Sequence, residues 1–374
     1  MLFDRIPKYK IEEFYAREEE LQLLFKGLEV GEGLIVVYGV RRVGKTSLVQ
    51  VGLTEYNVPY VIVDLRRFSE DPSLLSPSVL ASIVKNTLKE YEKYSGKVKK
   101  FAEKILDYIN SLDLKVIKLE VKGKRSELLV KVLEDVDKWA KKRNTRFVIV
   151  LDEAQELKII PAWRKILAWA LDTLENVTFI VTGSEVGVLK DFLRLDDRNS
   201  PLFGRARLEI YLKKFGREAA LDFLKRGFQE VEMKVVEEEL VDAVNRLDGI
   251  VGWLALYGYY RVSYNLPHNS TIERVEADAI ELIAGELEKL VKFSPKRYLA
   301  ILWAITLGLK TWSTIKHYAE GIVGHIPDNK YDRLLKNLVK YGFIEKTENL
   351  EYRVIDPLLP KVVEKLLRKH RIIS

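Results

Sequence analysis

The chain has no cysteine and only four histidines among its 374 residues. Without thiols it cannot form disulfides, use thiolate chemistry or build a cysteine zinc site, and four histidines leave little scope for histidine metal sites. No uninterrupted apolar run reaches 18 residues, and Met1 to Arg5 are not followed by an apolar signal segment. We therefore expect a cytoplasmic protein with no membrane association.

Basic residues outnumber acidic ones by 62 to 55, which gives a formal net charge of +7. Residues 285–374 contain 17 basic and 10 acidic side chains, whereas residues 1–284 contain 45 of each. The C-terminal part therefore carries the whole excess. Such an excess indicates an acidic partner such as nucleic acid, but an ordinary solvated surface also explains it. Abundant Lys and Glu with few Gln and Met residues are typical of a thermophile.

Residues 39–46, GVRRVGKT, follow the P-loop pattern G-x-x-x-x-G-K-[ST]. An apolar stretch over 34–38 precedes the motif and a helical pattern over 46–53 follows it, so the loop joins a strand to a helix. There the backbone N–H groups face a phosphate, Lys45 reaches the β and γ oxygens, and Thr46 ligates Mg²⁺. The sequence predicts an ATP or ADP site that comprises Gly39, Val40, Arg41, Arg42, Val43, Gly44, Lys45, Thr46 and Ser47.

A second buried strand is expected over 60–65, and a later apolar stretch, residues 147–151, ends in Asp152 and Glu153. Parallel strands bind ligands at their carboxyl ends, so Asp152 is expected beside Thr46 as a further Mg²⁺ ligand. Glu153 is expected to act as the base toward the attacking water. Paired carboxylates also occur in ordinary turns, but the preceding P-loop favours the catalytic interpretation.

Two later stretches carry further candidate residues. Thr182 and Ser184 follow the apolar run 177–181, and either hydroxyl could contact the γ-phosphate, although hydroxyls after strands are common. Arg205 precedes a last short strand over 208–210 and is by default a surface cation.

The remaining segments are mostly helical in pattern. Residues 67–146 predict an insertion with helices over 78–94, 97–110 and 126–142, an edge strand over 116–121, and a lysine-rich patch that is either a solvated face or a basic site. Residues 216–260 predict a helical lid, and 271–293 a further helix. From residue 294 three helices and a hairpin predict a winged helix. Its third helix presents an outer face for DNA, a protein or an internal brace, formed by Lys330, Arg333, Lys336 and Asn337.

Taken together, these features make the chain similar to the archaeal-type P-loop ATPases of the AAA+/STAND class. The resemblance is carried by the P-loop form Gly-x-Arg-Arg-x-Gly-Lys-Thr-Ser-Leu and by four further segments, Phe14-x-x-Arg17-Glu18-x-Glu20-Leu21, Leu151-Asp152-Glu153-Ala154-Gln155, Thr182-Gly183-Ser184 and Leu202-Phe203-Gly204-Arg205. The resemblance implies an α/β fold with a parallel five-stranded sheet in the order 5-1-4-3-2, then a helical lid and a winged helix. The corresponding domains are 1–213, 214–284 and 285–374.

The resemblance also implies roles for individual residues. Tyr15 and Arg17 would approach the base of the nucleotide, Ser184 would lie in the sensor segment, and Arg205 would be directed toward the γ-phosphate. The chain departs from its relatives at 249–251, where Gly-Ile-Val replaces a frequent Gly-x-Pro near the adenine.

The expected function is slow, Mg-dependent hydrolysis of ATP that drives a conformational switch, with Glu153, Lys45 and Arg205 as catalytic residues. One alternative is a nucleotide-gated signalling module with negligible turnover, and another is a DNA-binding factor similar to replication initiators. The candidate partners are duplex DNA or a protein at the winged helix, and a second copy of the chain when ATP is bound.

Overall fold

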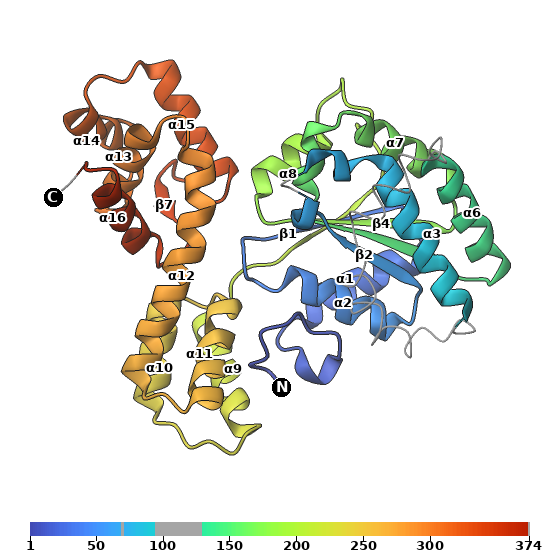
Figure 1. Cartoon of the computed structure of the whole chain (residues 1–374), viewed down its shortest axis with the longest axis horizontal. Coiled ribbons are helices and arrows are strands. Elements are labelled where there is room, and N and C mark those ends of the chain that lie inside the picture. Colours follow the sequence, from blue (N-terminus) through green and yellow to red (C-terminus); the bar gives the residue numbers. More distant parts are fainter. Residues whose placement is uncertain (69–70, 94–128, 373–374) are drawn as a thin grey trace. The chain divides into compact units, whose positions relative to one another are not determined.

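The computed structural model describes residues 1–68, 71–93 and 129–372, which form two compact units (Figure 1). The sheet unit comprises Pro7–Ser184 and Val188–Lys213. The helical unit comprises Met1–Ile6, Glu185–Gly187 and Lys214–Ser374. The helix predicted over 97–110, the edge strand predicted over 116–121 and the lysine-rich patch lie outside the described residues.

Five parallel strands form the sheet in the order β2-β3-β4-β1-β5, which confirms the predicted order. Their bounds are β1 (Leu34–Tyr38), β2 (Tyr60–Asp64), β3 (Phe147–Asp152), β4 (Val177–Gly183) and β5 (Leu208–Tyr211). Every residue of β1, β3 and β4 is buried. A parallel sheet is covered on both faces, so its strands are continuous apolar runs in the sequence.

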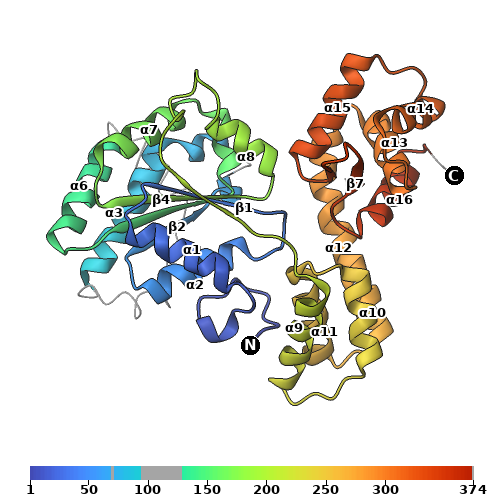
Figure 2. The ribbon, with the colours of Figure 1, turned by 180° about the vertical axis from the view of Figure 1, so that it is seen from behind.

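Helices cover both faces of this sheet. They are α1 (Glu18–Glu29), α2 (Lys45–Tyr56), α3 (Pro77–Lys93), α6 (Leu129–Lys142), α7 (Ala162–Thr173) and α8 (Val186–Leu193), with short 3₁₀ segments η1 (Ile11–Glu13), η2 (Leu65–Phe68), η3 (Pro72–Leu75) and η4 (Ala154–Ile159). α1 and α2 lie on one face, and α3, α6 and α7 lie on the other (Figures 1 and 2). The connection from β1 to β2 runs across the sheet in one direction, and the connections from β2 to β3 and from β3 to β4 run in the opposite direction. Because each crossover is right-handed, helices in connections of opposite direction lie on opposite faces.

The helical unit begins with four helices, α9 (Arg217–Gln229), α10 (Glu237–Leu247), α11 (Val251–Tyr264) and α12 (His268–Val291). α12 begins three residues before the predicted start and continues without interruption past residue 284. Phe3, from the N-terminal segment, packs edge-on against Phe223 and Phe228. Gly227 and Gly258 leave room for its ring, because a Cβ at either position would overlap it.

The end of the chain forms a winged helix from α13 (Pro295–Thr306), α14 (Trp312–Val323), α15 (Asp328–Lys340), β6 (Ile344–Lys346), β7 (Tyr352–Val354) and α16 (Leu359–Lys369). β6 and β7 pair in antiparallel register, as the sequence predicts. Trp253 of α11 donates an indole hydrogen bond to Asp356 at 3.0 Å, which joins the first helices of the unit to the winged helix.

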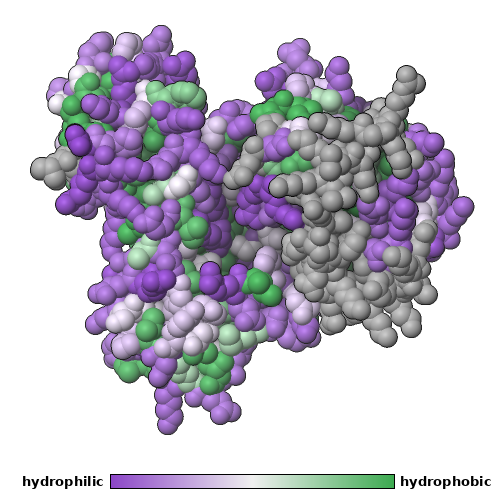
Figure 3. All heavy atoms as spheres, viewed as in Figure 1, coloured by the Kyte–Doolittle hydropathy of each residue, from purple (hydrophilic) through white to green (hydrophobic). Residues whose placement is uncertain are grey.

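Among the residues that Figure 3 colours, the visible surface is mostly hydrophilic, with separate small hydrophobic patches. None of the helices in the described ranges has the length and the apolar character needed to cross a bilayer.

Candidate functional site

The loop between β1 and α2 has the backbone geometry that its motif requires. Gly44 caps the start of α2 with φ of +94°, a left-handed conformation that suits glycine. At Gly39 a Cβ would lie 2.7 Å from the carbonyl oxygen of Leu212, so a side chain there would displace the neighbouring backbone. The loop therefore curls tightly into the first turn of α2, where unpaired N–H groups and the helix dipole favour an anion.

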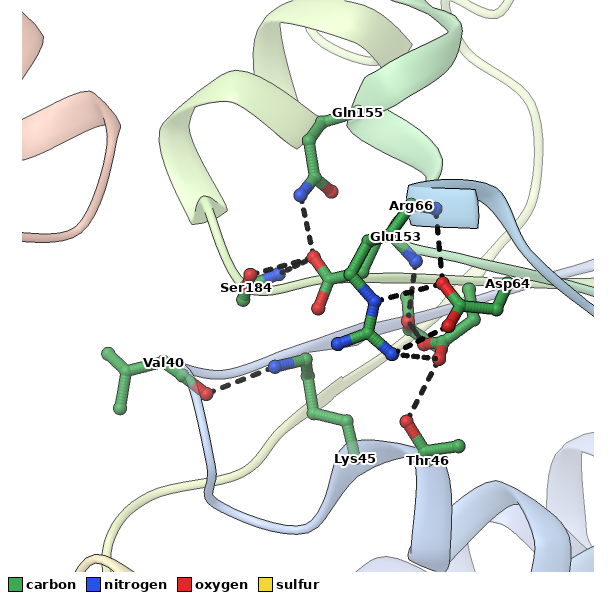
Figure 4. Close-up of polar contacts among 10 residues, drawn as sticks. Val40, Lys45, Thr46, Asp64, Arg66, Glu153, Gln155 and Ser184 are labelled. Carbon is green, nitrogen blue, oxygen red and sulfur yellow. Dashed lines mark hydrogen bonds and ion pairs between the residues drawn. The ribbon is translucent and has the colours of Figure 1, made fainter. Parts of the chain in front are cut away.

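Lys45 is the first residue of α2, and its side chain is buried with 6% exposure. Its Nζ donates to the carbonyl oxygens of Gly39 at 2.9 Å and Val40 at 3.0 Å (Figure 4). Burial lowers the pKa of Lys45, and the carboxylates of Glu153 and Asp152 oppose this shift. The ammonium group is thus held at the loop by neutral acceptors that an anionic ligand can replace.

Thr46 and Asp152 meet where the loop faces the end of β3. Thr46 Oγ1 donates to Asp152 Oδ2 at 3.0 Å, and Thr182 at the end of β4 donates to the other carboxylate oxygen. Burial and the neighbouring Glu153 raise the pKa of Asp152.

These are hard oxygen donors, which fit Mg²⁺. The described residues contain no group of three or more His, Cys, Asp or Glu side chains that could hold a metal ion.

Glu153 follows β3 in a left-handed conformation with φ of +57°. Its Oε2 accepts hydrogen bonds from the backbone N–H of Ser184 at 2.9 Å, from Ser184 Oγ at 2.7 Å and from Gln155 Nε2 at 2.6 Å (Figure 4). Burial opposes ionisation, but the Lys45 ammonium and these donors outweigh it and lower the pKa of Glu153 to about 2. The carboxylate is therefore ionised at neutral pH and is a weak base while the three bonds persist.

The structure brings Ser184 into the same cluster, since it holds Glu153. Arg17 lies elsewhere around the loop. It is buried at the start of α1, and its Nη2 donates to the carbonyl oxygens of Val43 at 3.3 Å and Lys213 at 2.6 Å. Arg17 thus links the P-loop residue Val43 to the chain segment at Lys213. Tyr15 is half-buried just before α1.

Lys8, also before α1, approaches the other end of the loop through its backbone. Its N–H donates to Ser47 Oγ at 3.0 Å.

The structure does not bring Arg205 into the cluster. Its guanidinium pairs with Asp172 of α7, with Nε at 2.9 Å and Nη2 at 2.5 Å from the carboxylate, and also donates to the carbonyl of Pro201. Neither partner belongs to the P-loop or to the end of β3.

Three further residues belong to the cluster although the sequence predicts no role for their side chains, namely Asp64, Arg66 and Gln155. Asp64 ends β2 and lies in register beside Asp152 in the parallel sheet. Arg66 forms an ion pair with Asp64 and turns toward the same cluster (Figure 4). The signal for Asp64 was present, because an acidic residue that ends a buried strand beside β3 must lie at the ligand-binding edge.

The winged helix presents only part of the predicted basic face. Arg333 and Lys336 of α15 are exposed and Lys330 is half-buried. Asn337 was wrongly placed on this outer face, because its Nδ2 donates to the hydroxyl of Tyr298 in α13 at 2.9 Å. Asn337 therefore joins two helices of the domain.

Comparisons with known proteins agree with this geometry. Residues 14–256 match the family model of an ATPase domain predominantly from Archaea, and residues 292–355 match the model of the C-terminal winged helix-turn-helix domain of MCM proteins. No curated protein matches the chain significantly in sequence.

Solved structures resemble the chain over nearly its whole length. The Walker-type ATPase of Pyrococcus abyssi is 36% identical, with coverage of 97% of this chain and 100% of that chain and a TM-score of 0.82. The ORC2 protein of Aeropyrum pernix is 14% identical, with coverage of 100% and 98% and a TM-score of 0.63. The second likeness shows a shared fold alone.

Proposed function

Because the chain belongs to the family of ATPase domains found predominantly in Archaea, we propose that it binds Mg-ATP at the P-loop and hydrolyses it to drive a conformational switch. The observation that carries this proposal is the convergence of Lys45, Thr46, Asp152 and Glu153 at the carboxyl edge of one parallel sheet. Open parallel sheets bind their ligands at that edge.

Each residue has a defined part in the proposed reaction. Lys45 exchanges its two carbonyl acceptors for phosphate oxygens of the nucleotide and neutralises their charge. Thr46 and Asp152 would hold Mg²⁺, which supplies further positive charge to the β- and γ-phosphates when bound. Glu153 receives the proton of the attacking water once its carboxylate leaves the donors that hold it.

Turnover is expected to be slow for a reason specific to this site. A carboxylate with a pKa near 2 is a poor general base at neutral pH, and Ser184 and Gln155 keep Glu153 in that state. We infer that Glu153 leaves Ser184 and Gln155 before it accepts the proton of the attacking water. This supports a switch, and it also favours the alternative of a nucleotide-gated module whose turnover is negligible.

The proposal is tested by substituting Lys45. Lys45→Ala should weaken ATP binding by about 10² or more, because the triphosphate loses its main protein cation and charge-assisted bond. Isothermal titration with ATP and Mg²⁺ measures the loss, and Lys26→Ala, an exposed lysine on α1, is the matched control. Equal affinities for the two variants would contradict the proposed site.

A second candidate function is binding of duplex DNA through the winged helix. The match of residues 292–355 to the winged helix of MCM proteins supports it, as does the excess of basic residues after 285. A protein partner at the same domain is the alternative.

Several assignments remain proposals of ours. They are the domain division 1–213, 214–284 and 285–374, base contacts by Tyr15 and Arg17, γ-phosphate sensing by Ser184, and an ATP-dependent assembly of copies. Since Arg205 pairs with Asp172 in its own chain, a catalytic role would require release of that pair.

A further inference from the structure

Arg66 lies in the second position of η2, directly after β2, and its side chain turns back over the end of that strand. Its Nε donates to Asp64 Oδ1 at 2.9 Å and its Nη2 to Asp64 Oδ2 at 2.9 Å. The backbone N–H of Arg66 donates to the same carboxylate at 3.1 Å. The bidentate bond of Nε and Nη2 to the Asp64 carboxylate fixes the plane and direction of the guanidinium.

That direction is toward the nucleotide cluster. Arg66 Nη2 lies 3.8 Å from Asp152 Oδ2, the oxygen that accepts the hydrogen bond of Thr46. Asp64 and Asp152 are neighbours in register, so the guanidinium spans both carboxylates at the edge of the sheet. Figure 4 shows Arg66 turned toward Glu153 and Thr46, and its side chain is 60% exposed on the open side.

The formal charges explain why a cation is needed at this position. Lys45 and Arg66 face three carboxylates, those of Asp64, Asp152 and Glu153. Arg66 adds positive charge beside Asp64 and Asp152, at the edge of the sheet that an incoming γ-phosphate would approach. A guanidinium is suited to this task because its planar donors match phosphate oxygens.

We propose that Arg66, held in place by Asp64, binds the γ-phosphate of ATP and stabilises the charge that develops there during hydrolysis. This inference rests on the proposed function and deepens it, because it adds a cation supplied by the chain's own β2 end. Arg66 would then distinguish ATP from ADP, whereas Lys45 also binds the β-phosphate that both nucleotides share. Asp64 is the corresponding positioning residue.

The test compares Arg66→Ala with Arg67→Ala, an equal charge change at the next, exposed residue of η2. Affinities for ADP and for adenylyl imidodiphosphate, a non-hydrolysable ATP analogue, are measured by titration calorimetry on the full chain. Arg66→Ala should reduce the preference for the analogue about tenfold and leave ADP affinity within about twofold, since a single phosphate contact is lost. Single-turnover hydrolysis should fall about 10²-fold.

Two further variants separate the proposed role from a merely structural one. Arg66→Lys should restore part of the preference for the ATP analogue over ADP, because lysine keeps the positive charge but lacks the paired donors of the guanidinium. Asp64→Asn should lower turnover less than Arg66→Ala and should add little to it in the double variant, because both act through one guanidinium.

The failures can be told apart. If Arg66→Ala and Arg67→Ala match the parent in both preference and turnover while the parent hydrolyses ATP, Arg66 is only a surface partner of Asp64. If the parent itself neither binds nor hydrolyses ATP, the proposed function fails and this inference with it.

Discussion

At the scale of single residues, the neighbours of Glu153 both keep its carboxylate ionised and lower its basicity. Its burial alone would favour the neutral acid, yet Lys45 and three hydrogen bonds keep it ionised. The same bonds that ionise the group also make it a weak base. If Glu153 is the base that we propose, its carboxylate has to leave these donors before it can accept a proton.

This arrangement predicts a pH dependence of stability. The pKa of Glu153 is lowered from 4.5 to about 2 on folding, so its contribution is present above about pH 4.5 and is lost as the pH falls toward 2. The advantage of the parent over Glu153→Gln in the free energy of unfolding should shrink by about 2 kcal/mol between pH 6 and pH 3. Urea unfolding at several pH values measures it.

The control for this series is Glu29→Gln, which alters an exposed carboxylate at the end of α1. The change with pH in the difference from the parent should be smaller for this control than for Glu153→Gln. A constant difference between the parent and Glu153→Gln would show that the carboxylate is not held ionised by its neighbours.

At the scale of elements, α15 is the helix of the winged helix through which we propose a contact with nucleic acid. Its inner face is fixed by Tyr331, Leu334, Leu335 and Leu338, which are all buried. Its outer face carries the cations Lys330, Arg333 and Lys336, while Asn337 is committed to Tyr298. These three cations are the phosphate contacts that we propose for that face.

If duplex DNA is the partner, the triple variant of Lys330, Arg333 and Lys336 to Ala loses up to three phosphate contacts. The slope of log affinity against log salt should then shrink by about 2 to 3 units, because fewer counterions are released. Fluorescence anisotropy with a labelled duplex at several salt concentrations measures the slope.

The matched control removes equal charge from another helix, through Lys138, Lys141 and Lys142 to Ala on the outer face of α6. It should keep the slope of the parent. The same affinity and slope in the α15 variant would exclude its outer face as a DNA contact and favour a protein partner.

At the scale of the whole molecule, the sequence was most informative where a pattern alone determines the structure. β1, β3 and β4 were found because buried parallel strands are continuous apolar runs, and the P-loop because its glycines are fixed by backbone geometry. The sheet order followed from the resemblance and is confirmed. The winged helix was predicted from the pattern of three helices and a hairpin after residue 294 and is also confirmed.

What could not be predicted depends on neighbours that are distant in sequence. Gln155 follows Glu153 in an irregular 3₁₀ segment, so no periodicity indicates that its amide returns to the carboxylate. Periodicity put Asn337 on an outer face, but the hydroxyl of Tyr298 comes from a different helix. The position of Arg66 beside Asp152 follows from the register of β2 against β3, which the sequence does not reveal.

The central claim is that this chain binds ATP through the P-loop and hydrolyses it with Glu153. The most direct test mixes the full chain with radiolabelled ATP and Mg²⁺ and follows bound nucleotide and released phosphate over a single turnover, for the parent and Glu153→Gln. The account predicts that the variant keeps the affinity of the parent but hydrolyses about 10²- to 10⁴-fold more slowly, so that intact ATP accumulates on the protein. Unchanged hydrolysis in Glu153→Gln, or a loss of ATP binding together with activity, would contradict it.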